Sequence, residues 1–325
     1  MPKKEQSLIY AYILDGKGGG RKLDWKEVEQ WTPDQGLLWV HLNYTATRSI
    51  RWINRHSPLD KIAAKAIVTE ESRPRAVPSA ESLLVFLRGV NLNPGQDPED
   101  MVSIRIWLNH HCIITTRKRR LLSVEDMVNM VEMGNGPKSP SEFLITLNER
   151  LTQRMSDVID NIDEQVGNLE EEVISQESRL LRPKIAELRR QCISIRRFLA
   201  PQREALNKLY SNQSPFLTPE DRLMIRETTD RVQRYIEDLD SARERAAITQ
   251  EELASRLSEQ LDKRMYMLSL VAVVFLPLGF ITGLLGINVA GMPGTEDKFA
   301  FWWVCILLGA IFIGIVGFLR SRKWM

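Results

Sequence analysis

The sequence predicts a cytoplasmic α/β domain with a mixed sheet, then a long helical hairpin and a stalk helix, and finally two C-terminal transmembrane helices. Three observations support this fold class. Residues 265–285 and 299–319 carry no charged side chain. At ~1.5 Å per residue each segment is long enough to cross the roughly 30 Å hydrocarbon core. Apolar residues at helical spacing precede these segments from residue 139 onward, and short β-like runs fill the chain before that point.

The first domain is expected over residues 1–138. Its strand-like runs are rich in Val, Ile, Leu, Trp and Tyr and are bounded by Gly, Pro and Asn, which is typical of β-strands; they are residues 8–14, 37–42, 83–90, 101–108 and 111–115. Two further segments, 58–71 and 123–132, have the pattern of helices. Because the runs are unevenly separated, a mixed sheet is favoured over a regular doubly wound one. The glycine-rich segment 15–20 lacks the P-loop pattern and is predicted to be a hairpin turn.

A helical hairpin is expected over residues 139–217. Ser139, Pro140 and Glu142 form a capping-box signature. Apolar residues then recur at spacings of three and four up to Val173, and a second such stripe runs from Ile185 to Leu209. The spacing predicts two long helices that pack as an antiparallel pair.

A stalk helix is expected over residues 218–264. The segment 218–221 repeats the capping signature, and neither Pro nor Gly interrupts the chain from there until Pro277. One helix should therefore run from residue 219 through the first apolar segment to residue 285. Its seam is broken by Arg243, Gln250 and Gln260. These polar positions either line a water-filled funnel or form a solvated helix face.

The flanking charges predict the orientation of the two spans. Lys263 and Arg264 precede the span at 265–285, and the tail at 320–325 is basic. Basic flanks remain in the cytoplasm, so both termini are expected inside and the loop at 286–298 outside. The chain is accordingly predicted to be a multi-pass protein of the inner membrane.

Composition narrows the classes of function. Charged residues make up 26% of the chain and the net charge is only +2, which argues against nucleic acid as a partner. The three cysteines are far apart in sequence and give no disulfide framework. No catalytic constellation and no nucleotide motif is recognisable, so the protein is not expected to be an enzyme or to need a cofactor.

Several motifs together resemble the CorA family of divalent metal ion transporters. They are Gly286-Ile287-Asn288 at the outer end of the first span, Met292-Pro293 close behind it, and the basic C-terminus. Magnesium-transporting members typically carry Gly-Met-Asn and Met-Pro-Glu, whereas this chain has Ile287 and Gly294. With local similarities at residues 39–44, 115–117 and 198–203, the chain is most similar to the zinc-transporter (ZntB) branch.

The resemblance implies a funnel-shaped homopentamer in the lipid bilayer, with the first span lining a central pore. It implies transport of zinc ions (Zn²⁺) across the inner membrane, with the direction and any proton coupling left open, and zinc as the substrate rather than a cofactor. A magnesium, cobalt or nickel channel of the same family is the alternative. A membrane-anchored helical scaffold or sensor is the alternative from a different class.

Three groups of residues are candidates for the permeation path. Gly286, Ile287 and Asn288 would form the pore entrance, where Asn288 offers a ring of carbonyl oxygens or caps the helix. A small-residue stripe either lines the pore or packs against other helices; it comprises Met265, Ser269, Ala272, Leu276, Gly279 and Gly283. Glu296 and Asp297 either form an external acidic ring that concentrates cations or are ordinary solvated loop charges.

Overall fold

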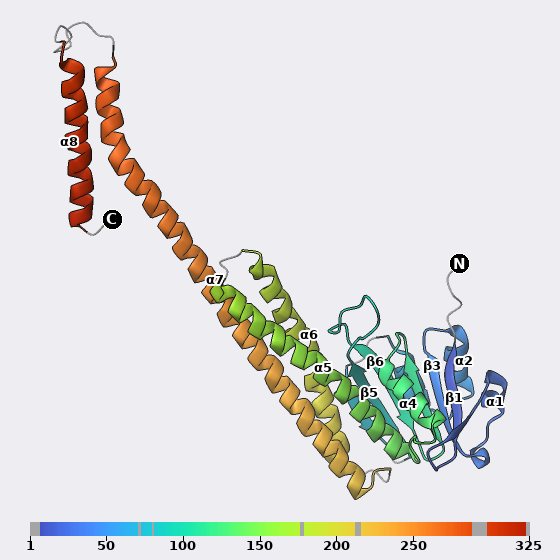
Figure 1. Ribbon diagram of the computed structural model, residues 1–325. Coiled ribbons are helices and arrows are strands. Elements are labelled where there is room, and N and C mark those ends of the chain that lie inside the picture. The colour runs from blue at the N-terminus through green and yellow to red at the C-terminus, as the bar shows by residue number, and fades with distance from the viewer. Residues whose placement is uncertain are drawn as a thin grey trace. The chain divides into compact units, whose positions relative to one another are not determined.

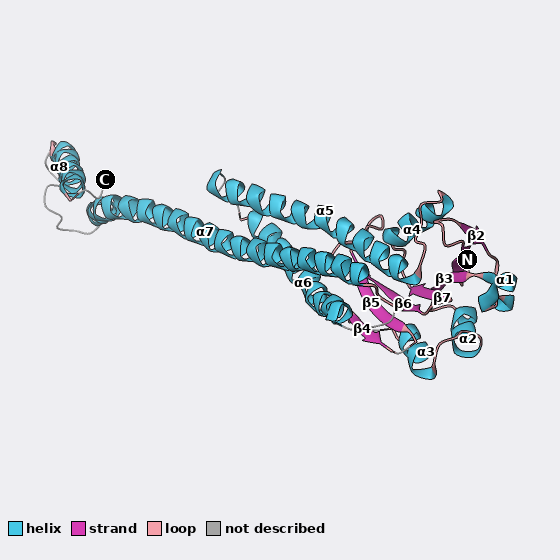
Figure 2. Ribbon diagram, turned by 90° about the horizontal axis from the view of Figure 1, so that it is seen from below, coloured by secondary structure: helices cyan, strands magenta, loops and turns pink. Residues whose placement is uncertain are grey.

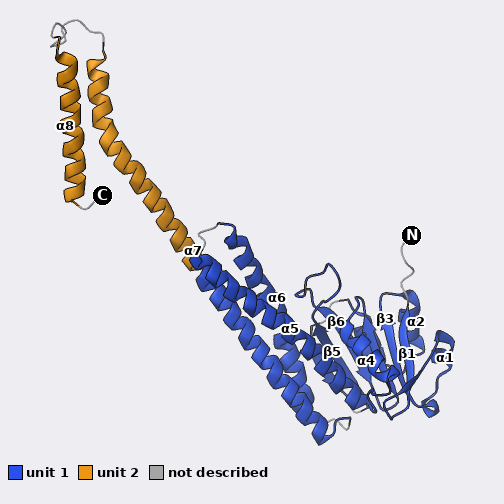
Figure 3. Cartoon of the chain, in the orientation of Figure 1, with its two compact units in different colours: residues 1–250 blue, residues 251–325 orange. Residues whose placement is uncertain are grey.

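The computed structural model describes residues 7–70, 73–79, 81–175, 179–211, 216–287 and 298–322. The chain divides into two compact units, residues 1–250 and 251–325 (Figure 3). Helix α7, Pro219–Leu285, contributes to both, because the division falls within it.

The first unit contains the mixed sheet that the sequence predicts. Its seven described strands lie in the order β2-β1-β3-β7-β6-β5-β4. Strands β3 and β7 are parallel, and the other neighbouring pairs are antiparallel. The strands are β1 Leu8–Leu14, β2 Gly20–Lys22, β3 Leu37–Asn43, β4 Arg75–Pro78, β5 Leu83–Gly89, β6 Val102–Leu108 and β7 Cys112–Arg117.

The turn between β1 and β2 is the predicted glycine-rich hairpin turn, which is thereby confirmed. Gly16 and Gly18 have φ angles of 69° and 112°, a region in which a Cβ is strained. The Asp15 carboxylate accepts hydrogen bonds from the backbone amides of Lys17 and Gly19 at 2.7 and 2.9 Å. These bonds close the loop on itself, and the Gly18 carbonyl accepts from the Gly136 amide at 2.6 Å.

Helices cover both faces of the sheet, as Figure 2 shows. Helices α1 Trp25–Gln30, α2 Thr47–Arg55 and α3 Lys61–Val68 belong to one face, where Trp52 and Ile67 join a core with Val40, Phe86 and Ile114. Helix α4, Leu122–Glu132, lies on the other face with the start of α5.

Of the two helices expected in this domain, one is shorter than predicted. The segment 58–71 becomes helical only at Lys61. The Asp60 carboxylate caps that end, accepting from Ile62 and Ala63 amides at 2.7 and 2.8 Å. The N-cap residue flanks the helix, so the helix does not include Pro58 and Leu59.

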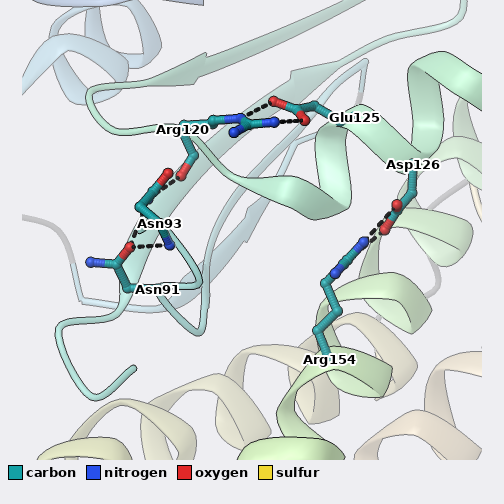
Figure 4. A network of polar contacts seen from close by, with 6 residues as sticks. All are labelled: Asn91, Asn93, Arg120, Glu125, Asp126 and Arg154. Carbon is teal, nitrogen blue, oxygen red and sulfur yellow. Dashed lines mark hydrogen bonds and ion pairs between the residues drawn. The ribbon is translucent and has the colours of Figure 1, made fainter. Parts of the chain in front are cut away.

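Polar contacts fasten the sheet to α4 and α5 (Figure 4). Arg154 of α5 holds the Asp126 carboxylate of α4 through bonds of 2.9 and 2.7 Å. Arg120, in the turn after β7, holds Glu125 through bonds of 2.5 and 2.6 Å. The amide of Asn93 donates to the Arg120 carbonyl at 3.0 Å, so the loop after β5 is tied to the same turn.

The hairpin and the stalk helix agree with the prediction. Helix α5 is Pro140–Ser175, α6 is Leu181–Ser211, and α7 begins at Pro219. The Thr218–Asp221 capping box is present, with bonds of 3.1 and 2.9 Å. At the start of α5 only half of the box forms. The Ser139 hydroxyl accepts from the Glu142 amide at 3.1 Å, but Glu142 accepts from Lys138 rather than Ser139.

The first part of α7 packs against α5 and α6 within the first unit. Arg245 of α7 contacts Glu170 and Asp163 of α5, the shortest bond being 2.6 Å. Gln250, one of the polar seam positions, accepts a 2.7 Å bond from Arg189 of α6. This glutamine is therefore part of the contact between helices of one chain.

Candidate functional site

The second unit contains two long apolar helical segments. They are residues 265–285 of α7 and most of α8, Ala300–Ser321. Their most apolar windows have mean hydropathies of 2.4 and 2.5, and only 6% of each window is buried. Large apolar patches on the surface of a soluble protein are costly in water, so the two helices require lipid or further copies of the chain around them.

The two helices lie side by side (Figure 1), and the side chains that are shielded identify the face of contact. On α7 these recur every three or four residues: Leu270, Val274, Leu278 and Ile281. On α8 most of them follow the same spacing: Val304, Leu308, Ile311, Ile315 and Leu319, with Ala300 and Val316 also partly shielded. Val274 and Leu319 are the most deeply buried, at 8% and 2% exposure. This spacing is that of a packed helix pair.

The small-residue stripe of α7 is on the other side of that helix. With about 100° of rotation per residue, its members centre roughly opposite to the α8-facing residues. Met265 and Leu276 are 61% and 71% exposed. A Cβ placed on Gly279 or Gly283 would meet no other atom within 4 Å. Within the part of the chain that the structure describes, all six members of the stripe are exposed.

The outer end of α7 closes at the predicted tripeptide. The Gly286 amide donates to the carbonyls of Thr282 and Gly283 at 3.0 and 3.1 Å. A Cβ at Gly286 would lie 3.2 Å from the Thr282 oxygen, so a glycine suits this crowded helix end. Ile287 is 47% exposed.

Several predicted site residues lie outside the described residues. They are Asn288, the Met292-Pro293 motif with Gly294, and the acidic pair Glu296 and Asp297. The roles predicted for them stay predictions.

The polar groups along the two spans are few. Ser269 donates to the Met265 carbonyl at 2.9 Å, and Thr282 donates to the Leu278 carbonyl at 3.0 Å, so both hydroxyls are satisfied within their own helix. Among the described residues, no cluster of three or more His, Cys, Asp or Glu side chains is placed to hold a metal ion. The described spans thus offer a cation no set of strong ligands.

The face that packs on α8 was not identified from the sequence. A span that is apolar all round has no polar face, so the sequence does not distinguish the positions that pack against another helix from those that face lipid. The small-residue stripe could be found because Ser, Ala and Gly differ in size from their neighbours.

The arrangement defines a membrane protein: a folded α/β unit with three long helices, the last of which continues into the first of two apolar spans. The family model described as "CorA-like Mg2+ transporter protein" matches residues 34–321. The chain belongs to this CorA family of divalent cation transporters, which are transporters and not enzymes.

Individual relatives are similar over nearly the whole chain. The divalent cation transporter CmaX of Pseudomonas aeruginosa is 36% identical over 325 residues, which is 99% of this chain and 98% of the relative. The zinc transport protein ZntB of Yersinia enterocolitica is 33% identical over 317 residues, 98% of this chain and 96% of the relative.

Solved structures agree with the fold. The full-length CmaX structure superposes with a TM-score of 0.84 at 35% identity and covers 100% of both chains. The CorA magnesium transporter of Methanocaldococcus jannaschii superposes with a TM-score of 0.81 over 98% of this chain and 99% of its own. At 18% identity the latter supports the fold alone.

Proposed function

We propose that this protein carries zinc ions across the inner membrane as a homopentamer whose pore is lined by α7. Two helices per chain cannot enclose an aqueous path, so permeation requires several copies. The observation that carries the proposal is the stripe on α7. It faces away from α8, and two of its glycines have open space beside them. This is the face available to a central axis.

In this proposal both termini are cytoplasmic and the loop at 286–298 is external. The charges at Lys263, Arg264, Arg320 and Arg322 favour that orientation. Asn288 would then present a ring of carbonyl oxygens at the outer mouth. Such a ring replaces part of an ion's hydration shell while binding weakly enough to release it. Glu296 and Asp297 would raise the local cation concentration outside the mouth.

Zinc is preferred as the substrate for two reasons. The ZntB relatives are named as zinc transport proteins, and Ile287 and Gly294 depart from the magnesium-type pattern. The second candidate is transport of magnesium, cobalt or nickel. It is favoured by the name of the CmaX relative, which specifies only a divalent cation.

The test is ion flux into liposomes that contain the purified full-length protein and a zinc-sensitive dye. Zinc influx above that of empty vesicles is expected, with less influx for Asn288→Ala. The control is Asn161→Ala, which changes an exposed asparagine of α5 and should transport like the wild type. Equal fluxes in protein-containing and empty vesicles would refute zinc transport, and the same vesicles loaded with a magnesium dye would test the second candidate.

Stoichiometry is tested separately by the mass of the detergent-solubilised protein. Five copies are expected. A dimer together with an absence of any divalent flux would instead favour a helical scaffold or sensor. Repeating the flux measurement with an imposed pH gradient tests proton coupling.

A further inference from the structure

The first unit contains a pocket of about 660 Å³ whose wall is mainly arginine. The residues come from β4, β5, α6, the loop before β6 and the turn after β7. Five of them are Arg73, Arg75, Arg88, Arg119 and Arg197, against only two carboxylates, Glu99 and Asp100. The lining therefore has an excess of three positive charges, in a chain whose overall net charge is only +2.

Aromatic rings hold several of these guanidinium groups in place. Arg75 lies over the ring of Phe86 at 4.2 Å, and Arg88 lies over Phe198 at 3.9 Å. Arg197 stacks on the same Phe198 ring at 4.8 Å. Stacking fixes the plane of a guanidinium group, and Arg88 also donates to the Met101 carbonyl at 2.8 Å. These cations are therefore oriented rather than mobile.

The neighbouring carboxylates do not neutralise the cluster. Asp100 reaches only Arg119, at 3.9 Å. In the described parts of the chain, no carboxylate lies within ion-pair distance of Arg73, Arg75 or Arg197. Burial, and after it the positive charges of Arg105, Arg119 and Arg197, together lower the pKa of Arg88 to about 10. The cations thus repel one another in the absence of an anion.

In the turn after β7, the neighbours of the pocket residue Arg119 have carboxylate partners outside the pocket. Lys118 pairs with Glu70 at 2.5 Å and Arg120 pairs with Glu125 at 2.5 Å (Figure 4). Arg119, which lies between them in the sequence, lines the pocket instead. The basic run Arg117-Lys118-Arg119-Arg120 therefore contributes one of its four cations to the pocket.

We propose that this pocket binds a small anion with a diphosphate group. The planar fork of arginine matches phosphate oxygens with paired hydrogen bonds, and several such forks converge here. The volume is within the range of small-molecule sites. Inorganic pyrophosphate and a nucleoside di- or triphosphate share this chemistry. Because Phe198 is already engaged by two guanidinium groups, the phosphates rather than a stacked base supply the affinity.

The proposal is tested by calorimetric titration of the full-length protein in detergent, with EDTA present so that no divalent cation bridges the ligand. Pyrophosphate and ATP are expected to bind saturably, and adenosine is not. Binding of ATP alone would overturn the assignment of affinity to the phosphates. The double variant Arg73→Gln/Arg197→Gln should bind pyrophosphate about tenfold more weakly or worse.

Matched variants separate this site from general charge effects. Arg51→Gln/Arg55→Gln removes the same charge from the exposed face of α2 and should leave affinity within about twofold. Ser194→Glu places a carboxylate at the half-buried pocket position on α6 and should abolish binding, whereas Ser194→Gln should not. If Arg73→Gln/Arg197→Gln does not fold, the comparison of Ser194→Glu with Ser194→Gln tests whether the pocket binds pyrophosphate.

Three results would overturn the proposal: no saturable pyrophosphate binding by the wild type, equal weakening in the α2 control, or unchanged affinity in Ser194→Glu. A change in oligomer mass in Arg73→Gln/Arg197→Gln would also overturn it, because the arginines would then contact another copy of the chain.

Discussion

Gly279→Leu should leave the fold intact and block ion flux. Gly279 belongs to the stripe that faces away from α8, and no atom lies within 4 Å of a Cβ placed there. A leucine is therefore accommodated by its own chain without a clash. In a symmetric pore, however, the substitution adds one leucine from every copy at the same depth, and such a hydrophobic ring gates by excluding water.

The Gly279→Leu substitution should have opposite effects on stability and on transport. Leucine is a better helix former than glycine by nearly 1 kcal/mol in water, so the melting temperature should be unchanged or higher. A tenfold loss of flux needs an added barrier of only ~1.4 kcal/mol, and a complete apolar constriction should exceed that. Zinc uptake into dye-loaded liposomes measures the flux, and thermal unfolding in detergent measures the stability.

Gly314→Leu is the matched control. Gly314 is on α8 and also has no atom within 4 Å of an added Cβ, but it is not part of the α7 stripe. Its substitution should change flux by less than about twofold. Wild-type flux in Gly279→Leu, or an equal loss in both variants, would show that the stripe does not line the path.

The remaining predictions concern the first unit. Phe143→Ala should destabilise the protein by about 3–5 kcal/mol, because the side chain is 0% exposed and meets Trp39 edge to face at 4.9 Å; denaturant unfolding measures this, and a loss below about 1 kcal/mol would contradict the packing argument. The Arg120 hydrogen bonds lower the pKa of Glu125, so their stabilisation is present above the ordinary Glu pKa of ~4.3 and is lost as pH falls through the lowered value. The stability difference between wild type and Glu125→Gln should accordingly shrink on acidification, and a pH-independent difference would rule this out. Thr218→Ala removes the N-cap of α7 and should cost about 1 kcal/mol, whereas Thr218→Ser should retain it; thermal unfolding of both variants is the measurement, with equal stabilities as the contrary outcome.

The long elements could be predicted because each has a strong local signal. Helix α7 was predicted from residue 219 to 285 and is observed as Pro219–Leu285, since a capping box begins it and no glycine interrupts it before the membrane span. The five strand-like runs all became strands. Helices α1 and α2 and strands β2 and β4 were missed. They are short, and residues such as Arg51 and Arg55 give α2 a polar sequence from which its buried Trp52 and Ile53 hardly stand out.

The arginine pocket illustrates what a sequence does not reveal. Its members are spread from residue 73 to residue 197, and no spacing relates them. The strand order brings β4 and β5 together at one end of the sheet, and α6 returns along the chain to face them. Only the tertiary fold therefore converts five separate surface-type residues into one site.

The chemistry of the spans restricts how a divalent cation is chosen. Neither 265–285 nor 299–319 contains a charged, histidine or amide side chain. Zinc that loses its water prefers imidazole nitrogen and thiolate sulfur ligands, and the single side chain of these two kinds in the two segments is Cys305 of α8. If the proposed pore is lined by α7, an ion moving along it must keep most of its hydration shell, because bare charge is far too costly in an apolar channel. Hydrated zinc and hydrated magnesium present similar surfaces to such a wall. In the proposed transporter, discrimination between them therefore belongs to the mouth formed by residues 286–298, where Ile287 and Gly294 differ from the magnesium-type pattern, and not to the pore below it.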